Sequence, residues 1–160
     1  MARNLGRTGL RITSISSAIT MLQLQGGSTI DTVIRDIGVS FDGTVVTNAP
    51  IDTQVLFQTA GSEAFTGTTP APTKIDTRSQ TPLLATMGYQ ATTEPTAGNE
   101  IFRWHIHPQT GILWQGTPFM DEVVASAYST GSSVIPRVGI KFATAPSAAI
   151  DTDLYFVFEE

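Results

Sequence analysis

The last ten residues of the chain, Asp151 to Glu160, constrain the fold more than any other stretch. They place five apolar residues between acidic ones, a composition typical of a single β-strand. Because side chains alternate across a strand, Tyr155 and Val157 share one face and the leucine and two phenylalanines share the other. Both faces are apolar, whereas a strand facing water shows polar residues at every second position. We therefore expect protein on both sides of this strand: its own core on one side, and a loop, a second sheet or another subunit on the other.

The rest of the chain also predicts short strands and no helix of ordinary length. Residues 81–88 carry an N-cap, a first-turn proline and a terminal glycine, which indicate one or two helical turns. Residues 121–128 are ambiguous between a strand and a short helix. This pattern excludes parallel βαβ architecture and leaves an antiparallel sandwich or barrel. Strands are expected within residues 19–24, 32–41, 44–47, 51–59, 99–107, 112–115, 133–143 and 151–160.

The connections between these strands differ in length. Residues 60–82, rich in Gly, Thr, Ser and Pro, predict a long surface excursion that can embrace a neighbouring chain. A second polar loop is expected at 90–98. Pro108 and Gly111 fit the loop of a β-hairpin, which would pair His107 with Ile112 and His105 with Trp114.

The start of the chain is basic, although the chain as a whole is acidic. Arg3, Arg7 and Arg11 are the only charged residues among the first eleven, whereas the formal net charge is −5 and the pI is about 4.9. We expect an extended N-terminal arm and first strand over residues 1–27, followed by a β-sandwich over residues 28–160. The arm either contacts an acidic partner or nucleic acid, or is a solvated, disordered start of the chain.

Composition bounds the partners and the environment. An acidic chain lacks the sustained basic surface that direct nucleic-acid binding needs. No run approaches the ~20 apolar residues that cross a bilayer, and no secretory pattern is convincing. We expect a soluble protein without a membrane partner. Charged residues make up only 14% of the chain, which suits a protein that is packed against other protein.

The chain carries little that resembles a catalytic or cofactor site. It has no cysteine, and no serine or threonine lies in a nucleophile motif. His105-Ile106-His107 places two imidazoles on one strand face, but two ligands are too few for a tight metal site unless an acidic residue or a second subunit completes it. We therefore expect a protein that is not an enzyme and uses no cofactor.

Three segments carry a resemblance to a known family. They are Ile34-Arg35-Asp36-Ile37-Gly38-Val39-Ser40-Phe41, Val134-Ile135-Pro136-Arg137-Val138-Gly139-Ile140 and Asp151-Thr152-Asp153-Leu154-Tyr155-Phe156-Val157-Phe158-Glu159-Glu160. These segments resemble jelly-roll virion proteins of tailed bacteriophages, namely capsid decoration (cement) proteins and head fibres. The resemblance implies a homotrimer that binds the outer surface of a phage capsid and stabilises joints between major capsid proteins. It implies a location on the virion, and in the host cytoplasm during assembly, and it supplies no catalytic residues.

Two sets of contact residues follow from this interpretation. The capsid-contact candidates are Arg3, Arg7 and Arg11, and the subunit-interface candidates are Tyr155, Val157, His105, His107 and Trp114. Deleting residues 1–11 is expected to weaken capsid attachment and to leave the body folded.

Two other functions remain as alternatives. One is a phage tail or baseplate component, and the other is a cupin-like or carbohydrate-binding domain that uses the histidines and tryptophans.

Overall fold

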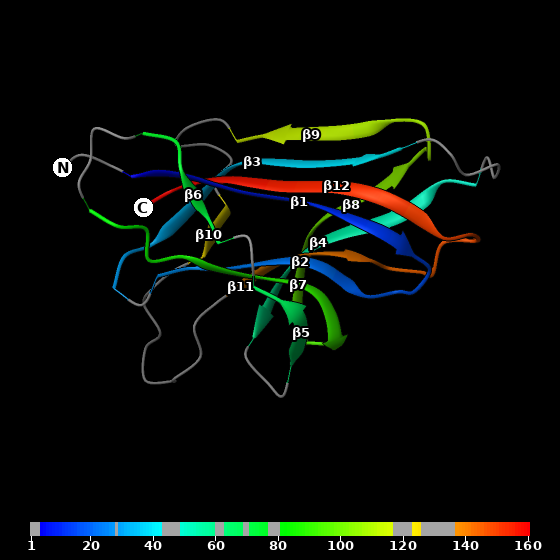
Figure 1. Ribbon diagram of the computed structural model, residues 1–160, viewed down its shortest axis with the longest axis horizontal. Helices are drawn as coiled ribbons and strands as arrows, with labels where there is room; N and C mark the ends of the chain where they lie inside the picture. The colour runs from blue at the N-terminus through cyan, green and yellow to red at the C-terminus, as the bar shows by residue number, and fades with distance from the viewer. Residues whose placement is uncertain are drawn as a thin grey trace.

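The computed structural model describes residues 4–27, 29–42, 49–59, 63–68, 71–76, 81–116, 123–125 and 137–160. Within these ranges the chain forms twelve strands and no helix, hence none long and apolar enough to cross a membrane. The strands form two six-stranded antiparallel sheets, sheet A and sheet B, that pack face to face (Figure 1).

Sheet A has the strand order β10-β3-β12-β1-β6, and β9 pairs with β3 on the same side as β10. Sheet B has the order β5-β7-β2-β11-β4-β8. The strands of sheet A are β1 (Leu5–Ile15), β3 (Thr32–Phe41), β6 (Thr73–Lys74), β9 (Gly111–Gln115), β10 (Val123–Ala125) and β12 (Ile150–Glu159). Those of sheet B are β2 (Thr20–Gln25), β4 (Ile51–Thr59), β5 (Ala64–Gly67), β7 (Thr86–Thr93), β8 (Thr96–Ile106) and β11 (Arg137–Phe142).

Eight of these strands are wound as a jelly roll. Taken in chain order, β1, β2, β3, β4, β8, β9, β11 and β12 pair first with eighth, second with seventh, third with sixth and fourth with fifth. The third strand also pairs with the eighth, and the fourth with the seventh. A long hairpin rolled in this way produces two Greek keys in two sheets. The predicted antiparallel jelly-roll-like sandwich is therefore confirmed.

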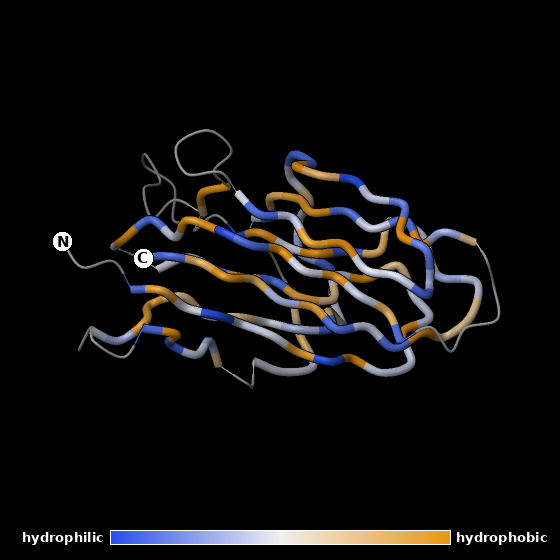
Figure 2. Tube along the Cα trace, turned by 90° about the horizontal axis from the view of Figure 1, so that it is seen from above, coloured by the Kyte–Doolittle hydropathy of each residue, from blue (hydrophilic) through white to orange (hydrophobic). Residues whose placement is uncertain are grey.

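The core lies between the two sheets and follows the alternation of side chains along each strand. Leu154, Phe156 and Phe158 of β12 are at most 1% exposed, as their spacing predicts. The opposing sheet contributes residues such as Leu24 and Ile140, which are fully buried. Burying each side chain of this size contributes roughly 1.5–3 kcal/mol. The same alternation of hydrophobic and hydrophilic residues is visible along the strands in Figure 2.

The start of the chain differs from the expected arm. From residue 5 onward it is β1, which lies between β12 and β6 in sheet A. Asn4 and Glu160 exchange backbone hydrogen bonds of 2.8 and 2.9 Å, so the first and last described residues lie side by side. The pattern was misleading because the buried face of β1 begins with Gly6 and Thr8, which carry little hydrophobic signal. Residues 1–27 thus contribute a strand to each sheet.

The expected hairpin between residues 99–107 and 112–115 is also wrong. The turn forms, with the Thr110 amide donating to the His107 carbonyl at 2.9 Å, but it carries the chain from sheet B to sheet A. His105 pairs with Asp52, and Trp114 pairs with Ile37. The physical reason is packing across the core. Phe102 stacks on Trp104 of its own strand in sheet B and contacts Trp114 of sheet A, with ring centroids 5.5 and 5.0 Å apart.

Residues 81–88 form no helical turn, since β7 begins at Thr86. The Glu160 carboxylate accepts hydrogen bonds from the backbone amides of Leu84 and Ala85 at 2.9 and 2.6 Å, which holds this segment extended. The expected loop at 90–98 is reduced to the connection between β7 and β8, and 60–82 contains the edge strands β5 and β6. Residues 123–125 are a strand, β10. The return strand expected at 44–47 and the Val134-Ile135-Pro136 segment lie outside the described residues.

The position of β1 in sheet A reverses the expectation that a chain lacking residues 1–11 stays folded. Deleting residues 1–11 removes most of a strand between two neighbours and exposes Phe156 and Phe158, so the remainder should fail to unfold cooperatively on heating. Circular dichroism melting measures this. Deleting residues 1–3 alone, which leaves β1 complete, is the matched control. A sharp, native-like transition in the chain that lacks residues 1–11 would contradict the assignment of β1 to the core.

Candidate interaction surface

The outer face of sheet A carries four of the eight residues that the sequence selects as contact candidates, namely Arg7, Arg11, Tyr155 and Val157. Its side chains are aligned in rows by the registers of β1, β12, β3 and β9. The middle row is Gly9, Tyr155, Gly38 and Leu113. On one side of it lies the row Arg7, Val157, Asp36 and Gln115, and on the other the row Arg11, Asp153, Ser40 and Gly111.

Tyr155 lies flat across the centre of this face. A Cβ built on Gly38 would come within 2.0 Å of the tyrosine ring, so the absence of a side chain there is what allows the ring to lie down. The Arg7 guanidinium carbon lies 4.9 Å from the ring centroid, a cation–π contact. Tyr155 and Val157 are consequently half-buried by their own chain, and the predicted second apolar face of β12 is only partly left for a partner.

A groove borders Tyr155 on the β1 side. It has a volume of about 460 Å³, and its lining includes Gly9, Arg11, Thr73 of β6 and Tyr155. On the opposite side of Tyr155, beyond Gly38, Leu113 projects from β9 with 52% of its surface exposed. The face therefore has a depression on one side of its central ring and an apolar projection on the other.

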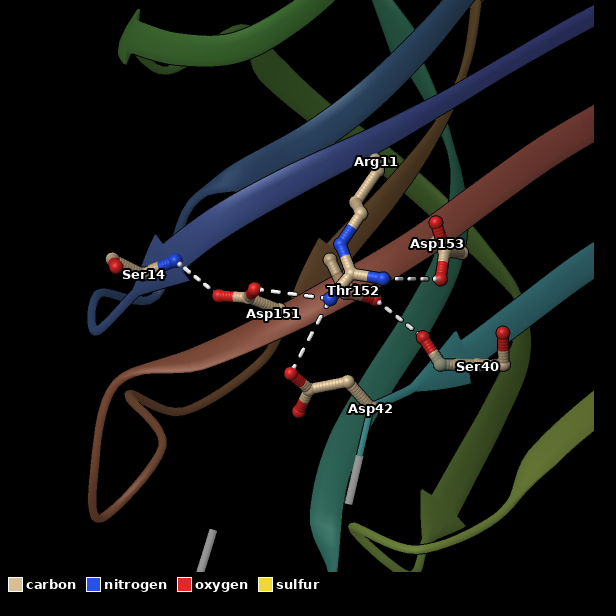
Figure 3. A network of polar contacts seen from close by, with 7 residues as sticks. All are labelled: Arg11, Ser14, Ser40, Asp42, Asp151, Thr152 and Asp153. Carbon is tan, nitrogen blue, oxygen red and sulfur yellow. Dashed lines mark hydrogen bonds and ion pairs between the residues drawn. The ribbon is translucent and has the colours of Figure 1, made fainter. Parts of the chain in front are cut away.

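Arg11, one of the expected capsid contacts, forms ion pairs within its own chain. Its guanidinium nitrogens lie 3.4 Å from Asp42, 3.2 Å from Asp151 and 3.8 Å from Asp153 (Figure 3). The hydrogen bond to Asp151, followed by the charge of Asp153, raises the pKa of the Arg11 guanidinium. The side chain is solvated, so these pairs contribute little to stability individually. They hold the Arg11 side chain beside acidic residues of its own chain.

Asp151 also shapes the end of β1. Its carboxylate accepts a 2.9 Å hydrogen bond from the backbone amide of Ser14, a non-glycine residue with φ of 57° (Figure 3). Few side chains adopt this left-handed conformation. It occurs where the β1–β12 register shifts, between Ile12 and Ile15. The Ser14 hydrogen bond, followed by that from Arg11, lowers the pKa of Asp151. Asp151 thus holds the bend at which the chain leaves sheet A.

The remaining predicted residues are not gathered on this face. Arg3 lies outside the described residues. Trp114 points into the core, where it packs on Phe102. The His105 side chain is exposed at the edge of sheet B, with its Nδ1 atom 3.9 Å from Asp52, and the His107 Nδ1 atom accepts a hydrogen bond from the Gln109 amide at 3.2 Å. No group of three His, Cys, Asp or Glu residues in the described part of the chain is arranged to hold a metal ion.

Asp52, the neighbour of His105, is bound mainly by another residue. Its carboxylate accepts two hydrogen bonds from Arg103, at 3.0 and 2.7 Å. These bonds lower the pKa of Asp52, and they raise that of the Arg103 guanidinium. The pair joins β4 to β8 at the edge of sheet B.

The outer face of sheet B is organised differently, by a chain of polar side chains. Gln23 donates to Gln58 at 2.8 Å, Gln58 donates to the Thr20 hydroxyl at 2.8 Å, and Thr20 donates to Glu94 at 3.0 Å. Gln58 is 1% exposed and Thr20 is fully buried. Arg137 donates to Gln23 at the other end, at 3.4 Å. All donors point from the cation toward the carboxylate, an arrangement in which each bond polarises the next.

Arg137 is the member of this chain of polar side chains whose burial costs free energy, because its guanidinium is charged. Burial lowers the pKa of its guanidinium, and its Nε atom is buried without a hydrogen-bond partner. Glu63 forms an ion pair with it. These two residues, with Gln23 and Phe65, line a second groove of about 370 Å³ on sheet B.

Sequence reasoning found Tyr155 and Val157 but missed Leu113, Asp36 and Gly9. A signal for Leu113 was present: Ile112 and Trp114 alternate with it, so a core position for the tryptophan implies an outward leucine. No comparable signal marks Asp36 or Gly9, because their places beside β12 depend on pairing between distant strands. No protein family, curated protein or solved structure matches the chain.

A mutation on sheet B tests the polar chain. A Cβ on Gly139 would lie 2.2 Å from the Gln58 amide oxygen, so Gly139→Ala should displace Gln58 and leave buried polar groups unpaired. We expect the free energy of unfolding to fall by about 1–3 kcal/mol in denaturant titration. Gly9→Ala is the matched control, since its Cβ would make only ordinary contacts, the nearest at 3.5 Å. Equal stability of both variants would contradict the account.

The role of Asp151 predicts a specific pH dependence. Because its pKa is below the ordinary 3.8 in the folded state, its contribution is present above that value and is lost as the pH falls through the lower, folded pKa. Asp151→Asn should therefore lower the melting temperature near neutral pH, and its curve should converge with that of the wild type as the pH falls below 3.8. Asp153→Asn, which lies 3.8 Å from Arg11, should have a smaller effect. Parallel curves for wild type and Asp151→Asn would refute this.

Proposed function

We propose that this chain is a structural virion protein that binds the outer surface of a phage capsid and stabilises joints between major capsid proteins. The observation that carries the proposal is a jelly-roll sandwich with an apolar centre on one outer sheet face, formed by Tyr155, Val157 and Leu113. Such a face suits assembly more than catalysis, because apolar surface outside the core is stabilised by covering it with protein.

The partner is inferred from the sequence resemblance. Two of the three resembling segments are β3 and β12, which pair along their length in sheet A, and the third includes β11 of the opposing sheet. The resemblance therefore lies mainly on strands at the centre of both sheets. A homotrimer at three-fold or quasi-three-fold positions on the capsid is part of the same proposal.

The alternatives gain no specific support. His105 and His107 each contact residues of their own chain at one edge of sheet B, and Trp114 lies in the core. A cupin-like metal site or a tryptophan platform for sugars would need them elsewhere. A tail or baseplate component would also bury the apolar face of sheet A in an assembly. The experiment below distinguishes it from a capsid component.

Co-sedimentation tests the proposal. The phage whose genome contains this gene supplies the heads. They should be purified from a mutant of that phage in which the gene is deleted, and then incubated with the purified protein. We expect saturable pelleting at a fixed ratio to the major capsid protein, and a higher disassembly temperature of the heads. Heads that already carry the protein are the control and should bind none. Absence of saturable pelleting, or binding to isolated tails alone, would contradict capsid decoration.

A further inference from the structure

We propose that a second copy of this chain docks face to face on the outer surface of sheet A, about a two-fold axis that runs along β12. The contact is a two-fold self-association, which can pair two of the proposed homotrimers and does not by itself form one. It goes beyond capsid binding and is tested without any capsid. Three features of the face are self-complementary about this axis: its shape, its charges and its apolar centre. Two-fold contacts require that a surface complement itself in this way.

The shape is complementary because a projection and a depression lie on opposite sides of the axis. Leu113 lies on β9, two strands from β12 on the β3 side. The groove over Gly9 lies on the β1 side and extends from Tyr155 to Thr73 of β6, which is two strands from β12. Rotation by 180° about β12 exchanges these sides. Each copy therefore places its Leu113 over the groove of the other.

The charges are complementary about the same axis. Arg7 and Asp36 flank Val157 in one row, on β1 and β3 respectively. Rotation about β12 places Arg7 of each copy opposite Asp36 of the other, forming two equivalent ion pairs. Neither residue has an ionic partner among the residues that the structure describes, whereas Arg11 contacts three aspartates and Arg35 pairs with Glu159 at 2.6 Å.

Charge also distinguishes this axis from the perpendicular one in the plane of the face. An axis across the strands through Tyr155 would keep each strand over itself and exchange the rows on either side. It would place Arg7 opposite Arg11 of the second copy, and Val157 opposite Asp153. The axis along β12 avoids these two contacts and superposes Val157 on Val157. It also sets Asp153 opposite Asp153, where each carboxylate lies 3.8 Å from Arg11 of its own chain, which offsets the repulsion. Like-charge contacts across an interface disfavour the wrong arrangement.

Glycine keeps the contact region low. Gly9 and Gly38 are the neighbours of Tyr155 in the middle row, and rotation about β12 places Gly9 of one copy over Gly38 of the other. The Tyr155 ring of each copy covers its own Gly38, on the β3 side of the axis, and so faces Gly9 of the other copy. Two sheet faces pack at about 10 Å when side chains between them are of moderate size. Bulky residues at both glycine positions would hold the faces apart.

Charge-reversed variants test the arrangement directly. Arg7→Asp alone and Asp36→Arg alone should each weaken dimerisation about tenfold or more, because each creates two like-charge contacts. Mixed together, the two variants should form a heterodimer with affinity near that of the wild type, since both ion pairs are restored, one with its original polarity and one with reversed polarity. Sedimentation velocity across micromolar concentrations measures the species, with 17.1 kDa per chain. Melting temperatures confirm that each variant is folded.

Two further variants test the shape independently of charge. Gly9→Val fills the groove, and its Cβ would make only ordinary contacts, the nearest at 3.5 Å to Tyr155, so the fold should persist while dimerisation is lost. Leu113→Asp should have the same effect. Ile30→Asp, at a residue that is 41% exposed outside the sheets, is the matched control and should leave the dimer intact.

Each outcome of these experiments either supports or rejects the two-fold contact. A dimer, or a larger even assembly, that the single charge variants dissociate and their mixture restores supports the two-fold contact. A wild-type monomer at about 100 μM, a trimer unaffected by Gly9→Val, or failure of the mixed variants to associate would each overturn it. Capsid binding by a monomer would preserve the proposed function and still reject this contact.

Discussion

The antiparallel pairing of β1 with β12 is the interaction on which the rest of the structure depends. It joins the two ends of the chain, from Asn4 beside Glu160 to Ile12 opposite Thr152. In a jelly roll the first and last strands close the outermost pair, and every inner pair is nested within it. The ladder also brings together residues as distant as Arg11 and Asp151, which are 140 positions apart. Such non-local pairing favours slow, cooperative folding.

The sequence predicted the elements whose pattern is complete in one segment. In β12, strict alternation of large apolar side chains identified the buried face and the outward Tyr155. The pattern in β1 is weaker, because its inward positions include Gly6 and Thr8, and its arginines appeared to mark a basic arm. Both residues are buried because Phe158 and Met87 fill the space beside them: a Cβ on Gly6 would lie 2.5 Å from the Phe158 ring, and Thr8 donates to the Met87 sulfur at 2.7 Å. Only the folded partners reveal that face.

Connections between strands were harder to predict than strands. A proline–glycine turn looks the same whether it joins neighbours in one sheet or crosses between sheets, so β8 and β9 were interpreted as a hairpin. The aromatic cluster of Phe102, Trp104 and Trp114 decides the matter through packing across the core. The candidate surface was found only in part for a related reason. Tyr155 and Val157 follow from alternation in β12, whereas Arg7, Asp36 and Leu113 become neighbours only through the registers of three other strands.

The two outer faces of the sandwich differ in what covering them with protein would gain. On sheet B, Gln23, Gln58 and Thr20 already satisfy one another and are almost fully buried, so a partner there would find few free donors or acceptors. On sheet A, Leu113 is half exposed, and Tyr155 and Val157 are half-buried. The groove beside Tyr155 stays open because Gly9, which lines it, has no side chain. Removing apolar surface from water contributes roughly 25 cal/mol per Å². Satisfied polar groups contribute little by comparison, so association is favoured on sheet A. Gly38 lets the Tyr155 ring lie flat, and Gly9 leaves the groove beside it open, so both glycines keep that face accessible.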